Sequence, residues 1–431
     1  MKFYSLNGKS KPVNFKEAVI RGIAPDGGLY FPESITALPE EFFHGIETLS
    51  QNEIAFRAIE QFVSADLPEH TLSAMLAEVL DFEFPLMEIE ENVAVLELFH
   101  GPTMAFKDVG ARFMARCLGH FSQNSDNEVT VLVATSGDTG GAVASGFLGV
   151  KGVRVVILYP SGKVSDVQES QLTTLGKNVV ALEVNGNFDD CQKMVKNAFV
   201  DTDLLGRMQL TSANSINVAR WLPQMFYFLF AYKQAKKKGK EIVFSVPSGN
   251  FGNICAGMVA QQLGMPVKHF IAATNINDTV PEFMKTGHYR PKPSSPTISN
   301  AMDVGNPSNF IRIRKLYEND LEALSKNLSS FAFTDSATKK AIFKIYEQSG
   351  YIADPHGAVG YLGLKTYLAD HPEFYGIFLE TAHPVKFLEV VEGTLGIRLE
   401  IPPQIQKVLQ KEKKSIKIGT YIDLKDFLLN R

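Results

Sequence analysis

The sequence is poor in cysteine: its 431 residues contain only three, Cys117, Cys191 and Cys255. They are odd in number, lie far apart and form no CxxC pair, which argues against a disulfide framework and against a zinc site. The nine histidines show no HxH or HExxH spacing, so metal ligation has no sequence support either. We therefore predict buried, reduced thiols and no bound metal.

Long apolar runs are also absent. No segment approaches the roughly 18 uninterrupted apolar residues of a membrane span, and the polar N-terminus, MKFYSLNGKSKPVNF, lacks the apolar stretch of a secretory signal. The most aromatic run, WLPQMFYFLFAY at 221–232, is too short to span and contains Pro223 and Gln224. It predicts a buried helix. We expect a cytoplasmic protein with no membrane partner, either a monomer or a homodimer.

No excess of one charge is present: 43 basic and 47 acidic residues give a formal net charge of −4. This balance gives no electrostatic basis for binding nucleic acid. An anionic substrate would have to be held by a few local donors or cations. The hydrophobic fraction of 45% is ordinary for a globular chain, and a chain of this length can bury a large core.

Short apolar runs that alternate with helical patterns carry the fold prediction. The expected strands are 129–135, 153–160, 179–184, 241–246, 267–274 and 375–381. Near-continuous apolar strands between helices are typical of parallel sheets covered on both faces, so we predict an α/β protein with two open, mostly parallel-sheet lobes.

The domain prediction follows from the same patterns. We expect an N-terminal, mainly helical domain at 1–80, a large lobe from 81–128 and 221–400, a small mobile α/β lobe at 129–220, and a solvated helical tail at 401–431. The Pro- and Ser-rich segment 287–300 predicts a surface loop that closes over a site.

Ligands bind at the carboxyl ends of strands in open α/β sheets, and three loops stand at such positions. The loop PSGNFGN (247–253) has two glycines ahead of a helix, so it fits either a phosphate cradle or a tight turn. In ATSGDTGG (134–141), Ser136 and Thr139 could bind a second anion, while Asp138 could simply cap the following helix.

The third loop, LELFHGPTMAFKD, places Lys107 just ahead of a helical pattern. A partly desolvated lysine has a lowered pKa and forms Schiff bases, although most lysines are ordinary surface residues. Thr381, where the last predicted strand ends, fits either a cofactor contact or a helix N-cap.

Read together, these loops resemble the threonine synthase family, in particular its longer bacterial and fungal branch. The matching segments, in family order, are PDGGLYFPE, LELFHGPTMAFKD, TVLVATSGDTGGA, VVILYPSGKVS, TSANSIN, SVPSGNFGN, FIAATNINDTVP, SNAMDVGNPSN, DPHGAVGY and TAHPVKF. They run from about residue 24 to residue 387. Each segment alone is weak evidence, whereas ten in order are specific.

The resemblance implies a pyridoxal 5′-phosphate (PLP) enzyme of fold type II, similar to the tryptophan synthase β subunit. It implies that Lys107 carries PLP as a Schiff base and serves as the catalytic base, and that Thr381 faces the pyridine nitrogen. The PLP phosphate would be held by Gly249, Asn250, Phe251, Gly252 and Asn253. Many relatives of this fold type have an asparagine where Asp138 stands here, which leaves the role of Asp138 open.

The family reaction converts O-phospho-L-homoserine and water to L-threonine and phosphate, the last step of threonine biosynthesis. We assign the substrate phosphate to Ser136 and Thr139, and we place Asp138 with them among the substrate-binding residues. The nearest alternative is a threonine-synthase-like phospholyase, which stops before water is added, or another fold-type-II PLP lyase. A third possibility is a non-catalytic α/β protein that binds a phosphorylated metabolite.

Overall fold

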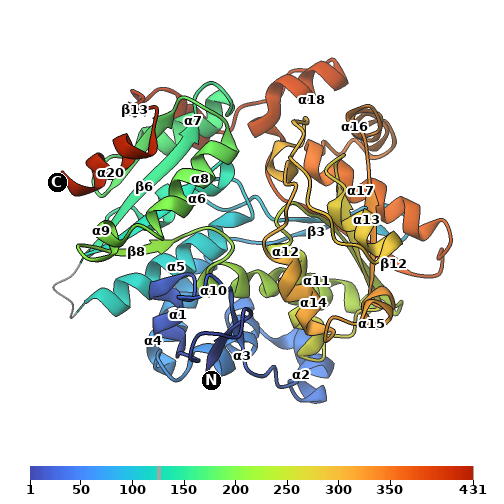
Figure 1. Cartoon of the computed structure of the whole chain (residues 1–431). Helices are drawn as coiled ribbons and strands as arrows, with labels where there is room; N and C mark the ends of the chain where they lie inside the picture. The colour runs from blue at the N-terminus through green and yellow to red at the C-terminus, as the bar shows by residue number, and fades with distance from the viewer. Residues whose placement is uncertain (124–127, 431) are drawn as a thin grey trace. The chain divides into compact units, whose positions relative to one another are not determined.

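The computed structural model describes residues 1–123 and 128–430. They form two compact units (Figure 1). Unit 1 contains Met1–Glu33, Lys107–Arg220 and Ile401–Arg431, and unit 2 contains Ser34–Phe106 and Trp221–Glu400. Each unit is built on one main sheet flanked by helices. The predicted α/β class with mostly parallel sheets is confirmed.

Unit 1 carries a five-stranded sheet in which every neighbouring pair is parallel. Its strands, in spatial order, are β13 (Ile416–Ile418), β7 (Val179–Val184), β6 (Val153–Pro160), β5 (Val129–Ala134) and β8 (Gln209–Ser212). The central strands β5 and β6 are apolar and buried almost throughout, as expected for a parallel sheet covered on both faces. A small antiparallel pair, β1 (Phe3–Ser5) with β2 (Tyr30–Pro32), belongs to the same unit.

The helices of unit 1 follow its strands along the chain. They are α1 (Phe15–Arg21), α5 (Lys107–Ser122), α6 (Asp138–Phe147), α7 (Asp166–Thr173), α8 (Phe188–Ala198), α9 (Thr202–Leu205), α19 (Pro403–Leu409) and α20 (Tyr421–Leu429). Helix α10 (Val218–Trp221) follows β8 in the chain, and the chain passes from unit 1 into unit 2 within this helix.

Unit 2 carries a six-stranded sheet. Its strands, in spatial order, are β11 (Leu328–Ala332), β10 (His269–Thr274), β9 (Ile242–Pro247), β12 (Tyr375–Glu380), β4 (Val93–Glu97) and β3 (Leu86–Glu90). All neighbours are parallel except β3 and β4, which are antiparallel. Since β9 and β12 are adjacent and parallel, the loops that follow them leave the same edge of the sheet.

Helices surround this second sheet. They are α2 (Glu40–Gly45), α3 (Gln51–Val63), α4 (Glu69–Val79), α11 (Met225–Ala235), α12 (Gly252–Gln262), α13 (Thr279–Thr286), α14 (Phe310–Leu316), α15 (Leu321–Ser325), α16 (Asp335–Ser349), α17 (Pro355–Leu368) and α18 (Leu388–Leu395). Of these, α17 packs across β9, β10 and β12. A Cβ added at Gly363 would lie 2.8 Å from Ala273 Cβ, so this glycine permits the close helix–sheet contact.

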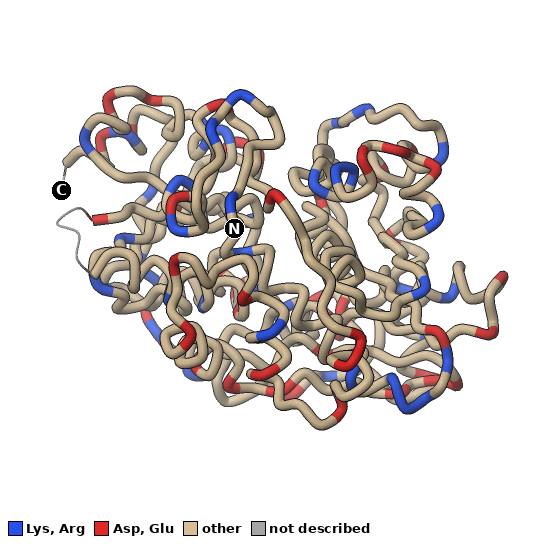
Figure 2. Tube along the Cα trace, turned by 90° about the horizontal axis from the view of Figure 1, so that it is seen from below, with Lys and Arg blue, Asp and Glu red and all other residues tan. Residues whose placement is uncertain are grey.

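Several sequence predictions are confirmed by the fold. The aromatic run becomes α11 with its preceding turn and is buried along almost its whole length. All three cysteines are free and buried. Segment 288–299 contains no helix or strand. Within the described ranges, no helix combines the length and apolarity that a membrane crossing requires. Acidic and basic residues are both spread over the trace, as Figure 2 shows.

The charged tail differs from the predicted solvated helix. It contains α19, β13 and α20, and β13 pairs in parallel with β7. Leu424 and Leu428 of α20 are fully buried in the core of unit 1. The prediction failed because the many lysines of the tail suggest a solvated helix and obscure the short strand β13 and the amphipathic helix α20.

The contact-based units also group segments that the predicted domains keep apart. Residues 1–33, 107–123 and the tail belong to unit 1 with the five-stranded sheet, while 34–80 belongs to unit 2. The proposed boundaries at 80, 128 and 400 stay a prediction about domains.

Candidate active site

Lys107 is the first residue of α5, and its side chain is 17% exposed. Its Nζ lies 3.9 Å from Oδ2 of Asp138, the first residue of α6. The Asp138 side chain is only 4% exposed. A lysine ammonium and a carboxylate that share so little solvent attract each other more strongly than the same pair on a surface. Two residues predicted from separate loops are thereby brought together in unit 1.

The backbone around Lys107 is held on both sides. The Phe106 N–H donates to the Thr381 carbonyl at 2.8 Å, and the Tyr227 hydroxyl donates to the Phe106 carbonyl. The Lys107 carbonyl accepts from Nη1 of buried Arg220 at 3.1 Å. These bonds fix the peptides on either side of the lysine Cα, so its side chain starts from a defined position.

The loop before Lys107 has an anchor of its own. Lys386 is fully buried, and its Nζ donates to the Thr103 carbonyl at 2.9 Å. A charge-assisted hydrogen bond of this kind is stronger than a neutral one. Met104, one residue further on, has a positive φ of 56°. The loop is therefore a shaped element and not a loose connection.

The loop that contains Asp138 is organised by two side chains. Thr135 Oγ1 accepts from the N–H groups of Gly137 at 2.9 Å and Gly140 at 2.8 Å. Gln168 Nε2 donates to Asp138 Oδ1 at 3.0 Å. A Cβ at Gly137 would lie 2.3 Å from the Gln168 amide carbon, so only glycine fits there.

These contacts of Asp138 point away from a plain capping role. The N-cap residue of α6 is Gly137, which has no side chain, and Thr135 Oγ1 accepts from the Gly140 N–H in the first turn. The Asp138 carboxylate faces Gln168 and Lys107. The role of Asp138 at the substrate stays a prediction. Ser136 and Thr139, in the same loop, are partly exposed.

The loop between β9 and α12 is closely packed. A Cβ at Gly249 would lie 2.6 Å from the Ala301 carbonyl oxygen, so no side chain can stand there. Phe251 has a left-handed φ of 60° and is the N-cap of α12, which begins at Gly252. The first N–H groups of a helix lack intrahelical partners and face the loop, where they attract an anion. The turn fits a phosphate group.

Two side-chain contacts shape this loop. Asn253 Nδ2 donates to the Pro247 carbonyl at 2.9 Å, and Asn250 Oδ1 accepts from Ser308 Oγ at 3.1 Å. Both contacts hold the turn in place around the backbone N–H groups. The fit to PLP phosphate therefore rests mainly on the glycine-permitted backbone.

Thr381 follows the last residue of β12 and is 6% exposed. The helical turn after it has His383 as its N-cap, with His383 Nδ1 accepting from the Val385 N–H at 3.1 Å. The alternative of Thr381 as a plain N-cap is therefore wrong. Thr381 and the Gly249 loop both follow the carboxyl ends of neighbouring strands, because β12 and β9 are adjacent and parallel.

Sequence reasoning missed Gln168, Tyr227 and Arg220. Gln168 is 30 residues from its partner Asp138, and Tyr227 is 121 residues from Phe106. Tyr227 lies in the aromatic run that predicted a buried helix, and a buried tyrosine hydroxyl generally needs a partner. The buried hydroxyl of Tyr227 was therefore the sequence signal from which a hydrogen-bond partner could have been predicted.

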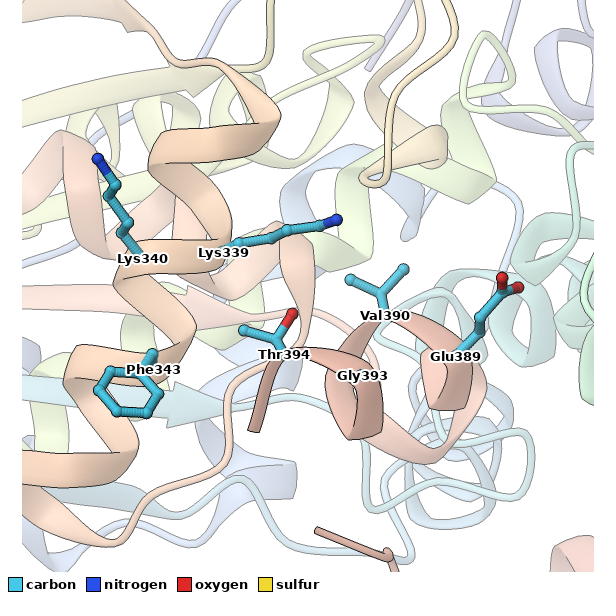
Figure 3. A pocket seen from close by; sticks show the side chains of 7 residues that line it. All are labelled: Lys339, Lys340, Phe343, Glu389, Val390, Gly393 and Thr394. Atoms are coloured by element: carbon cyan, nitrogen blue, oxygen red, sulfur yellow. The ribbon is translucent and has the colours of Figure 1, made fainter. Parts of the chain in front are cut away.

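A hollow between α16 and α18 does not involve these residues. It is lined by Lys339, Lys340, Phe343, Glu389, Val390, Gly393 and Thr394 (Figure 3). None of the predicted site residues lines it. In the described residues, no group of three or more His, Cys, Asp or Glu side chains is arranged to hold a metal ion.

Comparison with known proteins identifies the family of the chain. Residues 85–374 match the family model for pyridoxal-phosphate dependent enzymes, which places the chain in that enzyme class. Residues 2–79 match the model for the threonine synthase N terminus, and 357–427 the model for the threonine synthase C-terminal region. The chain belongs to the threonine synthase family.

Individual relatives extend along almost the whole chain. Threonine synthase of Escherichia coli is 43% identical over 94% of both chains, and that of Haemophilus influenzae is 44% identical over 94% of both. The crystal structure of the E. coli enzyme superposes with a TM-score of 0.93 over 100% of both chains, at 40% identity. The PLP-bound threonine synthase of Brucella melitensis gives 0.93 at 31% identity, covering 100% of this chain and 99% of that one.

Proposed function

We propose that this chain converts O-phospho-L-homoserine and water to L-threonine and phosphate, as a PLP-dependent carbon–oxygen lyase that acts on phosphate. The observation that carries the proposal is the 43% identity to a threonine synthase over 94% of both chains. Lys107 beside Asp138, on a clamped backbone, is the local geometry that supports it.

Different residues are assigned to the different parts of the cofactor. Lys107 Nζ would be the amine that holds the PLP aldehyde. The backbone N–H groups of 249–253 would hold the cofactor phosphate at the start of α12. The Thr381 hydroxyl would be a neutral partner for the pyridine nitrogen. PLP, when bound, supplies the electron sink for the carbanion.

The chain's own groups supply the proton transfers and the second anion site. The free Lys107 amine would take the proton from Cα of the substrate and would exchange protons at Cβ and Cγ. Asp138 Oδ2, 3.9 Å from Lys107 Nζ, orients this amine between these transfers. Ser136 and Thr139 hold the substrate phosphate, which leaves from Cγ before water adds at Cβ.

A coupled assay tests the function. Purified protein loaded with PLP and given O-phospho-L-homoserine should release phosphate and threonine in equal amounts. Release of phosphate with 2-oxobutyrate would identify a phospholyase instead. A protein that binds no PLP and releases no phosphate would contradict the proposal altogether.

A further inference from the structure

Two carboxyl groups meet in the core of unit 2, directly beneath the end of β12. Glu380 is the last residue of β12 and Asp354 is the N-cap of α17, and both are fully buried. Glu380 Oε1 accepts from the Asp354 N–H at 2.5 Å. The pKa of Glu380 lies well above its usual range. The main cause is burial, and the second is the nearby charge of Asp354.

The neighbouring histidine shows which carboxyl group is ionised. The Ala301 N–H donates to His356 Nε2 at 3.2 Å, so this nitrogen carries no proton. The proton of a neutral imidazole is then on Nδ1, which lies 2.7 Å from Asp354 Oδ1. The same oxygen also accepts from the His356 N–H at 2.5 Å. Asp354 is thus the acceptor of two N–H groups and carries the charge.

One proton accounts for the two oxygens that remain. Asp354 Oδ2 and Glu380 Oε2 are buried, and among the described residues neither carboxylate oxygen receives a hydrogen bond from an N–H or hydroxyl group. Since the two side chains are in hydrogen-bond contact, a proton on Glu380 Oε2 that is shared with Asp354 Oδ2 would satisfy both atoms. Space for this oxygen is provided by Gly357, where a Cβ would lie 1.7 Å from Oε2.

The two ends of this chain of contacts reach the proposed cofactor site. Glu380 is joined by a peptide bond to Thr381. At the other end, His356 holds the Ala301 N–H, and the Ala301 carbonyl packs where a side chain of Gly249 would stand. Every one of these contacts lies within unit 2.

We propose that Glu380, Asp354 and His356 form a buried proton-sharing chain that positions Thr381 and the Gly249 loop for PLP. The three are positioning residues, because they act through Thr381 and Ala301. The inference rests on the proposed function for the roles of Thr381 and the loop. With Glu380 neutral, the pair carries one negative charge and not two beneath the residue assigned to the pyridine nitrogen.

Exchange of each carboxyl group for its amide tests the position of the proton. In Glu380→Gln the amide N–H₂ replaces the shared proton and the amide oxygen still accepts from the Asp354 N–H, so the pair stays matched. In Asp354→Asn the new N–H₂ faces the proton of Glu380. Asparagine is as good an N-cap as aspartate, so α17 keeps its cap. In the double variant two N–H₂ groups face each other.

The first measurement does not depend on PLP. The infrared spectrum of the apo protein at pH 8 should contain the carbonyl stretch of a protonated, buried carboxyl group, which Glu380→Gln removes. The exposed Glu347→Gln in α16 is the control and should leave the band in place. A wild-type spectrum without this band, or a band that survives in Glu380→Gln, would overturn the proton assignment.

The second measurement is the dissociation constant of PLP, from titration of the apo variants. Glu380→Gln should bind within about twofold of wild type. Asp354→Asn should bind about tenfold more weakly, since it leaves an unmatched buried donor. The double variant should bind most weakly. If Asp354→Asn kept its affinity for PLP while Glu380→Gln lost it, the shared proton would belong to Asp354 and not to Glu380. Unchanged affinity for PLP in all three variants would contradict the positioning role.

The two measurements also separate this inference from the proposed function. A wild-type protein that shows the infrared band but binds no PLP contradicts the function. A protein that binds PLP equally in every variant contradicts only the positioning chain.

Discussion

Gln168 Nε2 donates a 3.0 Å hydrogen bond to Asp138 Oδ1, and the other carboxylate oxygen lies 3.9 Å from Lys107 Nζ. Gln168 also accepts from the Ser165 N–H in the capping box of α7. Gln168→Glu keeps that acceptor but sets a second carboxylate against Asp138. We expect kcat/KM to fall about tenfold or more, because a buried like-charge contact costs at least 1–2 kcal/mol.

The pH titration of the PLP visible absorbance should also move to higher pH in Gln168→Glu, since a second anion favours the protonated form of nearby Lys107. Gln406→Leu, at an exposed position of α19, is the control. An unchanged titration together with wild-type activity would show that Gln168 is only a helix cap.

Lys107→Ala should abolish the visible absorbance of bound PLP and lower kcat by about 10³-fold or more, because it removes both the bond to the cofactor and the proton carrier. The matched control is Lys151→Ala, at an exposed position outside the site. Absorbance spectra after gel filtration with excess PLP check the first effect. A yellow, active Lys107→Ala protein would refute the assignment of this lysine.

Gly249→Ala should weaken PLP binding, because the added Cβ would lie 2.6 Å from the Ala301 carbonyl and force the loop to move. We expect a loss of about tenfold in affinity, corresponding to about 1–3 kcal/mol of overpacking. Gly393→Ala in exposed α18, where nothing lies within 4 Å of the new Cβ, should leave affinity unchanged. Equal affinities for the two variants would detach the 249 loop from the cofactor.

The carboxyl of Asp303 predicts a pH dependence of stability. Burial raises its pKa to about 6, although hydrogen bonds from Thr297 and Asn275 oppose the rise. An acid with a raised folded pKa binds more protons folded than unfolded between pH 3.8 and 6. Its contribution to the free energy of unfolding is therefore complete below pH 3.8 and is lost as the pH rises through 6.

The difference in urea midpoint between wild type and Asp303→Asn, measured from pH 4 to pH 6, reports this contribution. The midpoint of wild type should decline relative to that of the variant over this interval. Exposed Asp370→Asn should show no such relative slope. A relative rise with pH would mean that the folded pKa of Asp303 is lowered and not raised.

The parallel sheets could be predicted because their strands are buried on both faces. The runs at 129–135 and 153–160 are apolar without alternation, and they became β5 and β6. Strand β13 could not be predicted in this way, since only Ile418 of its three residues is buried. A strand at the sheet edge has little apolar signal, and its pairing with β7 depends on residues far away in the chain.

The site shows the same division between local and distant information. Glycine turns after strands pointed to the loops at Ser136 and Gly249, since their geometry is encoded locally. The partners of Asp138 and Glu380 are 30 and 26 residues away, at Gln168 and Asp354. His356 lies in the DPHGAVGY segment of the resemblance, but its contact with Ala301 could not be predicted, because the two residues are 55 positions apart.

The pairing of β13 with β7 has a consequence for how the chain is made. Ser415, next to β13, donates to Glu183 of β7 across 232 residues at 3.1 Å. During synthesis, β7 leaves the ribosome long before the segment that covers its edge exists. In that interval the edge is open to pairing with other chains. The nascent protein should therefore depend most on chaperones between the emergence of β7 and that of β13.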